Sequence, residues 1–378
     1  MKRSGAIRGA RWAMGVALIT IGVMARGQSA RPAGPLTEEG ELGGAAFRID
    51  IPQGWNGGLV MYAHGYERVA PARRGYNLVI VEAARRIGYA VAQSQYSVQG
   101  WAAREGILDT EALRRHFVAK YGRTYPTIIA GHSQGGAISF RTIELYPEVC
   151  DGALPMCGTA EPALKFFKER VFDMRLLFDY FFPGLPGSVV EFPDGERTME
   201  TVSAKARELI DAKAEAAERF VRMVNLPDVN SIPGVIGFWS EILRELTART
   251  GGNAFDNRNT VYAGSEDDAR LNREIPRHAA DRGAVEYLRR WVTVTGRISD
   301  PVVAVHTFVD QLVPVESVRH MEQLAQLAGT TDLFVQLYVD RVGHCAFNAE
   351  ETLEALTRLD RWVRTGERPP PGDITRTP

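Results

Sequence analysis

The chain has 378 residues, 45% hydrophobic and 24% charged, a composition typical of globular proteins that excludes wholesale disorder and fibrous repeats. Its 45 Lys and Arg nearly balance its 46 Asp and Glu, but five of these bases lie in residues 1–30, which hold no acid, so the remainder is mildly acidic and we expect no nucleic-acid partner. The length allows about two domains, or one large α/β domain with an insertion, and three cysteines are too few for a disulfide scaffold.

Residues 1–30 have the layout of a secretory signal peptide. Four bases, ending at Arg11, precede an apolar run at 12–24, and small residues follow as far as Ala30. A retained membrane anchor is the alternative, but a span needs about 20 apolar residues. We therefore expect a secreted or periplasmic protein, with no stable membrane insertion once the signal is removed.

Strands and helices alternate along most of the chain. In chain order, the apolar patterns predict strands at 47–52, 59–63, 89–95, 127–130, 152–156, 301–309 and 333–339. Helices are predicted at 77–87, 109–121, 133–146 and 350–363. This alternation predicts the α/β class, with a mainly parallel sheet and helices on both of its faces.

The alternation stops between residues 159 and 299, where the pattern is helical. The helices predicted there cover 163–182, which is rich in aromatic residues, then 199–224, 235–250 and 284–292. We expect a helical insertion at 161–295 on a core made of 31–160 and 296–365. The tail at 366–378 is rich in Pro, and we expect it to be disordered.

One pentapeptide concentrates the chemistry. Gly131-His132-Ser133-Gln134-Gly135 follows a β-branched run and opens a helix, which is the context that the G-x-S-x-G nucleophile elbow requires. Side chains two positions either side of the serine would collide across such a tight turn, so both positions must be small. A plain strand-to-helix turn is the alternative reading.

With this motif the chain resembles the α/β-hydrolase superfamily, and in particular its serine esterases and lipases. The resemblance covers about 45–160 and 296–365, and the helical segment stands where this family places a cap. It implies a catalytic triad in the chain order Ser, acid, His.

The resemblance implies that the acid follows the strand after the cap. Residues 301–314 read PVVAVHTFVDQLVP, similar to the family segment H-G-x-x-D-x-x-V-P, and the match points to Asp310. Thr307 and Phe308 depart from that pattern, since smaller residues are usual there. Asp300, Asp332 and Asp340 are alternative candidates for the catalytic acid. Asp340 is the strongest of these, because it also ends a predicted strand.

The histidine is expected on the loop after the last strand, where His344 lies. In the triad, Ser133 would be the nucleophile, His344 its base, and Asp310 the group that orients the imidazole. His306 is expected to be a hydrogen-bonded core residue. His64 and His132 are assigned to other parts of the site, His116 to a helix, and His278 and His320 to no role.

An oxyanion hole needs two backbone N–H groups. The family pattern assigns one to Gln134, the residue after the nucleophile, and the other to the loop His64-Gly65-Tyr66, where we choose Tyr66. An ordinary loop glycine is the alternative for Gly65.

Cysteines supply a side hypothesis. Cys150 and Cys157 flank one strand and are too far apart to bridge. Cys157 ends that strand at the edge where the site is expected, and Cys345 follows His344, so a Cys157–Cys345 disulfide would hold the catalytic loop. Three free, buried thiols are the alternative.

We therefore expect an exported serine hydrolase that cleaves a small-molecule or oligomeric ester through an acyl-enzyme. A peptidase or amidase of the same fold is the first alternative, and a non-catalytic binding protein on this fold is the second. The aromatic residues of 163–182 are interpreted as cap core or as a pocket above Ser133. No metal or cofactor motif is present in the sequence, so none is expected.

Overall fold

The computed structural model describes residue 32 and residues 34–68, 75–192 and 199–375, so the expected signal peptide lies outside the described residues. The described part contains a nine-stranded sheet. Its strands are β1 (Leu36–Leu42), β2 (Ala45–Ile51), β3 (Leu59–Ala63), β4 (Ala90–Ser94), β5 (Thr127–His132), β6 (Gly152–Met156), β7 (Val302–Val309), β8 (Phe334–Val342) and β9 (Gly372–Asp373).

The strand order in space is β1-β2-β4-β3-β5-β6-β7-β8-β9. β1 pairs with β2, and β2 with β4, in antiparallel fashion, while every other pair is parallel. Parallel neighbours need a crossover connection, and helices supply it. The carboxyl ends of β3, β5, β6, β7 and β8 therefore meet at one edge of the sheet, as the predicted α/β class requires.

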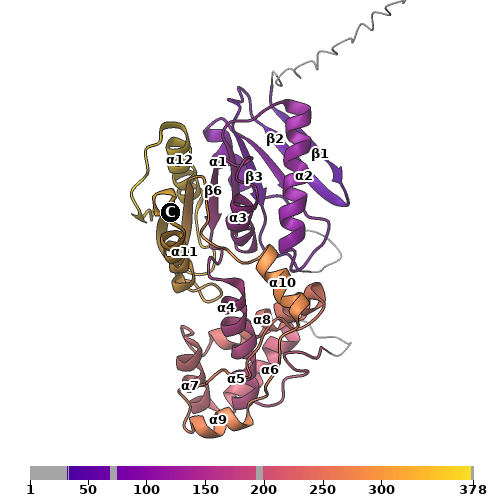
Figure 1. Cartoon of the computed structure of the whole chain (residues 1–378), viewed down its shortest axis with the longest axis vertical. Helices are drawn as coiled ribbons and strands as arrows, with labels where there is room; N and C mark the ends of the chain where they lie inside the picture. Colours follow the sequence, from indigo (N-terminus) through magenta and orange to yellow (C-terminus); the bar gives the residue numbers. More distant parts are fainter. Residues whose placement is uncertain (1–31, 33, 69–74, 193–198, 376–378) are drawn as a thin grey trace, which may run out of the picture.

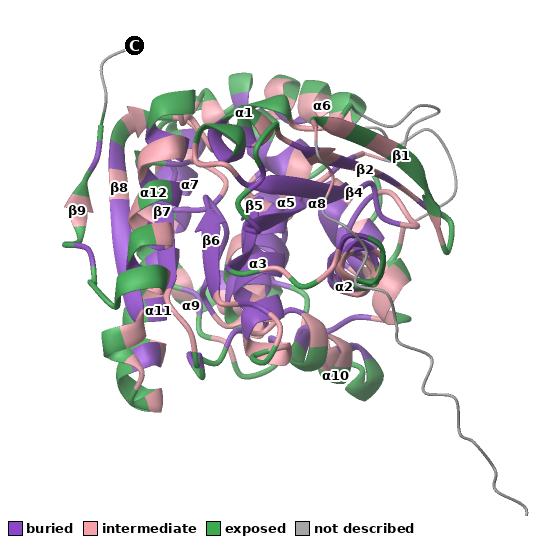
Figure 2. Ribbon diagram, turned by 90° about the horizontal axis from the view of Figure 1, so that it is seen from above, coloured by how far each residue is buried: buried purple, intermediate pink, exposed green. Residues whose placement is uncertain are grey.

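Helices cover both faces of this sheet. α1 (Leu78–Arg86) and α12 (Ala349–Thr365) pack on one face. α2 (Ala103–Tyr121), α3 (Gln134–Leu145) and α11 (Val315–Ala328) pack on the other. The central strands are consequently buried on both sides and read as apolar runs, whereas β2 alternates between buried and partly exposed residues (Figure 2).

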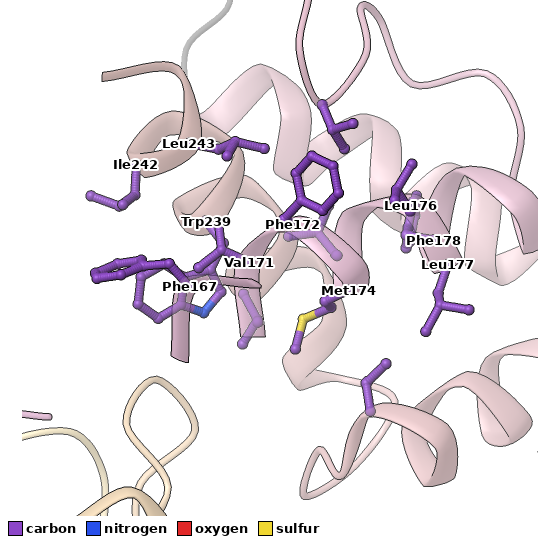
Figure 3. Packing of buried hydrophobic residues seen from close by; sticks show 14 of the residues in the cluster. Phe167, Val171, Phe172, Met174, Leu176, Leu177, Phe178, Trp239, Ile242 and Leu243 are labelled. Atoms are coloured by element: carbon purple, nitrogen blue, oxygen red, sulfur yellow. The ribbon is translucent and has the colours of Figure 1, made fainter. Parts of the chain in front are cut away.

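A second, helical body lies beyond one end of the sheet (Figure 1). We call it the cap. Its helices are α4 (Ala163–Phe167), the π-helical segment η1 (Lys168–Asp173), α5 (Met174–Phe181), α6 (Met199–Asp211), α7 (Ala214–Val224), α8 (Ser231–Thr250), α9 (Asp268–Glu274) and α10 (Arg282–Trp291). They enclose an apolar cluster that also includes Trp101, Ala103 and Val313 of the core. In this cluster Phe167 lies against Trp239 (Figure 3). None of the described helices is both long enough and apolar enough to cross a bilayer.

Two predicted cap helices are interrupted. The helix expected at 163–182 passes through η1, and the one expected at 199–224 breaks between Asp211 and Ala214. The break has a tertiary cause, because α6 packs on α8 whereas α7 packs on α5, where Phe220 meets Phe178 edge to face at 5.7 Å. A helical pattern in the sequence does not reveal such a change of partner.

The prediction of a disordered tail at 366–378 was wrong for the residues that the structure describes. β9 adds to the edge of β8, and Ile374 is 4% exposed. Arg368 donates a hydrogen bond to the carbonyl oxygen of Phe334 and lies over the ring of Trp362. One apolar anchor and a free strand edge therefore order a segment whose Pro content suggested disorder.

Candidate active site

The turn between β5 and α3 has the strained geometry expected of an elbow. Ser133 has φ +56°, a region that is costly for a residue with a side chain. A Cβ on Gly131 would lie 2.4 Å from the carbonyl oxygen of Gly135, and one on Gly135 would lie 2.0 Å from that of Ala63. Only glycine fits these two positions, so the sequence pattern and the backbone path require each other.

Ser133 occupies the N-cap position of α3, yet its side chain does not cap the helix. Its backbone N–H donates to the carbonyl oxygen of Met156 at 2.9 Å and approaches the sulfur of Cys157 at 3.3 Å. The elbow is thus tied to the end of β6, and the hydroxyl is left for another partner.

That partner is His344. Its Nε2 lies 2.8 Å from Ser133 Oγ, and its Nδ1 lies 2.6 Å from Asp310 Oδ2. A carboxylate can only accept, so Nδ1 carries the proton and donates to Asp310, and Nε2 accepts from the serine hydroxyl. The structure therefore brings together the three side chains that the sequence predicted, from positions up to 211 residues apart.

Asp310 is held from both sides. Its Oδ1 accepts the backbone N–H groups of Leu312 and Val313, each at 2.9 Å. Burial alone would raise the pKa of Asp310, but the hydrogen bond and charge of His344, with the Val313 N–H, outweigh burial and lower the pKa. The carboxyl group is therefore kept ionised beside the imidazole.

The rival carboxylates are elsewhere. Asp340 and Asp332 are exposed, and Asp300 precedes the start of β7, at the end of the strand opposite Asp310. His306 is fully buried, and its Nε2 bonds the carbonyl oxygen of Val313 at 2.7 Å, as expected of a core histidine.

His132, the residue before the serine, belongs to a second chain of hydrogen bonds. Asn77 donates to the hydroxyl of Tyr62 at 2.7 Å, and Tyr62 lies 3.0 Å from His132 Nδ1. Burial, followed by the charge of His344, lowers the pKa of His132 to about 4. The ring is therefore neutral at pH 7 and accepts the proton of Tyr62.

The His64-Gly65-Tyr66 loop lies against the elbow. A Cβ on Gly65 would lie 3.2 Å from the carbonyl oxygen of His132, which shows how closely the two loops approach. Gln134 stands at the start of α3, with its side-chain amide buried and no partner for it among the described residues. The two predicted oxyanion residues thus flank Ser133.

Sequence reasoning missed the residue that fixes Tyr66. The Tyr66 hydroxyl donates to Glu245 of α8 at 3.0 Å, and Glu245 also accepts the backbone N–H of Trp101 at 2.7 Å. Burial raises the pKa of Glu245 despite these two donors. A glutamate within the buried run of α8 was the only sequence signal for this link between cap and loop.

The structure pairs Cys157 and Cys345 as a disulfide, with Cα atoms 5.3 Å apart, and leaves Cys150 as a buried thiol. The bridge joins the end of β6, which holds the Ser133 backbone, to the residue after His344. These cysteines and His344 form the only His, Cys, Asp or Glu cluster with metal-binding spacing among the described residues, and both sulfurs are used in the disulfide.

Two cavities meet at Ser133 and His344. The larger, about 540 Å³, is lined by polar and apolar residues, and we call it the polar cleft after the charged and amide side chains at the β3 and β4 ends; Met199, Phe238 and Leu312 supply part of its apolar wall. The smaller, about 30 Å³, lies beneath rings of the cap, and we call it the aromatic cavity. Tyr66, Phe238 and Leu312 also border both.

The strand order, with a serine elbow between β5 and α3 and an Asp and a His after β7 and β8, defines an α/β-hydrolase fold. A family model described as a tannase-like family of unknown function matches residues 43–228. A search of the curated proteins found no match.

The solved structures that match this chain are distant in sequence. A presumed lipase from Acinetobacter baumannii is 14% identical, with 89% of this chain and 94% of that chain covered and a TM-score of 0.46. An esterase/lipase from an uncultured bacterium is 13% identical, with 88% and 85% covered and a TM-score of 0.45. A thioesterase domain from the curacin biosynthetic pathway is 13% identical, with 88% and 100% covered and a TM-score of 0.40.

Proposed function

We propose that this protein is a serine hydrolase that cleaves carboxylic esters through an acyl-enzyme on Ser133. The observation that carries the proposal is the continuous hydrogen-bonded chain from Ser133 through His344 to Asp310. A neutral serine is a weak nucleophile, and an adjacent base oriented by a third group is the arrangement that activates it.

In the first half-reaction, Ser133 Oγ attacks the ester carbonyl and gives its proton to His344 Nε2. The ionised Asp310 stabilises the imidazolium and holds its tautomer. The alcohol oxygen then takes this proton as its bond to the carbonyl carbon breaks, and the acyl group remains on Ser133. Water repeats the sequence with His344 as base, and the acid is released.

Negative charge develops on the carbonyl oxygen in both steps. We assign its stabilisation to the backbone N–H groups of Gln134, at the start of α3, and Tyr66. The positive end of the α3 dipole adds to this effect. Because the Tyr66 hydroxyl is bonded to Glu245, the cap helps to fix this loop.

Export remains part of the proposal. A structural disulfide persists in an oxidising compartment, which favours a secreted or periplasmic location. The Cys157–Cys345 bridge is such a disulfide and therefore supports this assignment.

The test is Ser133→Ala with p-nitrophenyl acetate as substrate. We expect kcat to fall by about 10⁶-fold, because the nucleophile and its base act as one unit. Ser139→Ala is the matched control, since Ser139 lies on the same helix and, within the part of the chain that the structure describes, its hydroxyl bonds only the carbonyl oxygen of Gly135. Near-normal turnover by Ser133→Ala would refute the assignment.

Two outcomes would point to the alternatives. Faster Ser133-dependent cleavage of peptide nitroanilides than of esters would make the protein an amidase or peptidase, since the triad itself serves both. Ligand binding without Ser133-dependent hydrolysis of any acyl substrate would indicate a binding protein.

A further inference from the structure

The two cavities beside Ser133 differ in wall chemistry. The polar cleft is lined by carboxylate, guanidinium and amide side chains, among them Glu67, Arg68, Asn77 and Gln93. Arg68 and Asn77 are only partly buried, so the cleft borders solvent. Arg68 already pairs with Glu200, and Asn77 bonds Tyr62 and Gln93. A guanidinium has five N–H groups and an amide has two, so these bonds leave donors unused, and such donors suit a group with several hydroxyls.

The aromatic cavity has the opposite character. Trp101, Phe166, Phe167 and Trp239 are each no more than 5% exposed. Their rings pack edge to face, with centroids 4.9 Å apart for Trp101 and Phe167, 5.1 Å for Phe166 and Phe167, and 5.7 Å for Phe166 and Trp239. Figure 3 shows Phe167 and Trp239 lying against each other at the base of the cap. Such close-packed rings resist displacement.

The size of the aromatic cavity limits what it can hold. Its volume of about 30 Å³ exceeds the roughly 10–15 Å³ that one water needs, and leaves room for a group of two or three heavy atoms. A longer chain would have to displace the rings, which costs about 1–3 kcal/mol for each overpacked position.

The order in which the ester bonds form and break indicates which cavity holds the acyl group and which holds the alcohol. The alcohol must leave and water must enter while the acyl group stays bonded to Ser133. A cavity walled by buried rings suits the group that stays, and a cleft with partly exposed walls suits the group that departs. His344 borders both cavities and so can give its proton to an alcohol in the polar cleft.

We propose that the substrates are short-chain esters, acetates above all, of alcohols rich in hydroxyl groups such as sugars and polyols. This inference rests on the proposed function. The acetyl methyl enters the aromatic cavity and the polyol occupies the polar cleft. In the first step the Ser133 Oγ–carbon bond forms, the carbon–alkoxy oxygen bond breaks, and the serine proton leaves with the polyol. Water then releases acetate and restores the serine proton.

The acyl side is tested with the full chain and p-nitrophenyl acetate, butyrate and octanoate. We expect kcat/KM to fall about 100-fold from acetate to octanoate. Phe166→Leu, which widens the aromatic cavity, should raise the octanoate-to-acetate ratio about tenfold. The matched control is Phe172→Leu, because Phe172 is equally buried in the cap but lines neither cavity and packs on Phe255 instead. Its ratio should stay at the wild-type value.

The alcohol side is tested with two acetates of primary alcohols, hexyl acetate and glucose acetylated at its primary hydroxyl. We expect kcat/KM to be about tenfold higher for the sugar ester, as hydrogen bonds in the polar cleft are made only by the hydroxylated group. Equal rates for the two, or a preference for octanoyl over acetyl esters, would overturn this inference and leave the Ser133 mechanism intact. Failure to hydrolyse any ester in a Ser133-dependent way would overturn the proposed function and this inference with it.

Discussion

The sheet core and the cap contribute to the site in different ways. In the core, Ser133, Asp310 and His344 follow three strands that meet at one edge of the sheet, and backbone contacts too close for a Cβ set the position of the serine. In the cap, large side chains shape the aromatic cavity by packing against one another. We therefore expect core substitutions to change the rate for every substrate. Cap substitutions should instead change which substrates are accepted.

After Ser133→Ala, the largest effect expected in the core is that of Asp310→Asn. The amide can present its NH₂ group to His344, which favours the wrong imidazole tautomer, and kcat should fall by about 10⁴-fold for all esters alike. Steady-state rates on the acetate and octanoate esters measure this. Asp340→Asn, at an exposed rival position, should change kcat by no more than about twofold. A large loss in Asp340→Asn instead would identify that residue as the acid.

The disulfide couples the core fold to the position of the histidine. Cys157 and Cys345 are 188 residues apart in sequence, so the double substitution Cys157→Ala/Cys345→Ala should lower the free energy of unfolding by about 2–5 kcal/mol. It should also lower kcat, because His344 loses its tether. Denaturant titration and ester hydrolysis, each with and without reductant, measure both effects. The control is Cys150→Ala, which keeps the bridge and should respond to reductant as the wild type does. An unchanged free energy of unfolding in the double variant would show that the bridge does not stabilise the fold.

Gly→Ala substitutions in the core and in the cap should have opposite effects on stability. Gly135→Ala in the elbow should cost about 3 kcal/mol or more, because the new Cβ would meet the carbonyl oxygen of Ala63 at 2.0 Å. Gly234→Ala in α8 meets nothing within 4 Å and should stabilise the cap by roughly 0.5–1 kcal/mol, since alanine favours a helix over glycine. Thermal unfolding of both variants gives the comparison. Equal stability of the two would remove the steric account of the elbow.

A further effect on stability is expected from the pH dependence set by His132. Its pKa of about 4 in the folded protein lies below the unfolded value near 6.5, so the unfolded state binds more protons between these pH values. The stability contributed by neutral His132 is therefore complete above about pH 6.5 and lost as pH falls toward 4, by up to about 3 kcal/mol. Denaturant titrations from pH 7 to pH 4 measure it, and His132→Gln should show a flatter dependence. A variant that loses stability as steeply as the wild type would contradict the shift.

Much of the core could be predicted because its chemistry is local in sequence. β3 and β6 have the predicted bounds, and the elbow pattern located Ser133 at the turn where the structure places it. The strand β1 was missed, although Gly43-Gly44, both with positive φ, form the two-residue turn that joins it to β2. That signal was present, and the acidic sequence of this edge strand obscured it.

The features that the sequence did not predict depend on contacts between segments distant in the chain. The link from Tyr66 to Glu245 joins residues 179 positions apart, and nothing near either residue indicates the other. The short helix α9, the helix α11 and the pairing of β9 with β8 were also missed, since each owes its stability to neighbours supplied by the fold. The volumes of the two cavities likewise follow from packing, which a single sequence does not encode in any local pattern.

The central claim is that Ser133 is a nucleophile activated by His344. The most direct measurement is reaction of the folded protein with a fluorophosphonate, followed by peptide mapping of the adduct by mass spectrometry. We expect one covalent adduct, on the peptide that holds Ser133, no adduct in Ser133→Ala, and much slower labelling in His344→Ala. An adduct on another residue, or equal labelling with and without the imidazole, would contradict the claim.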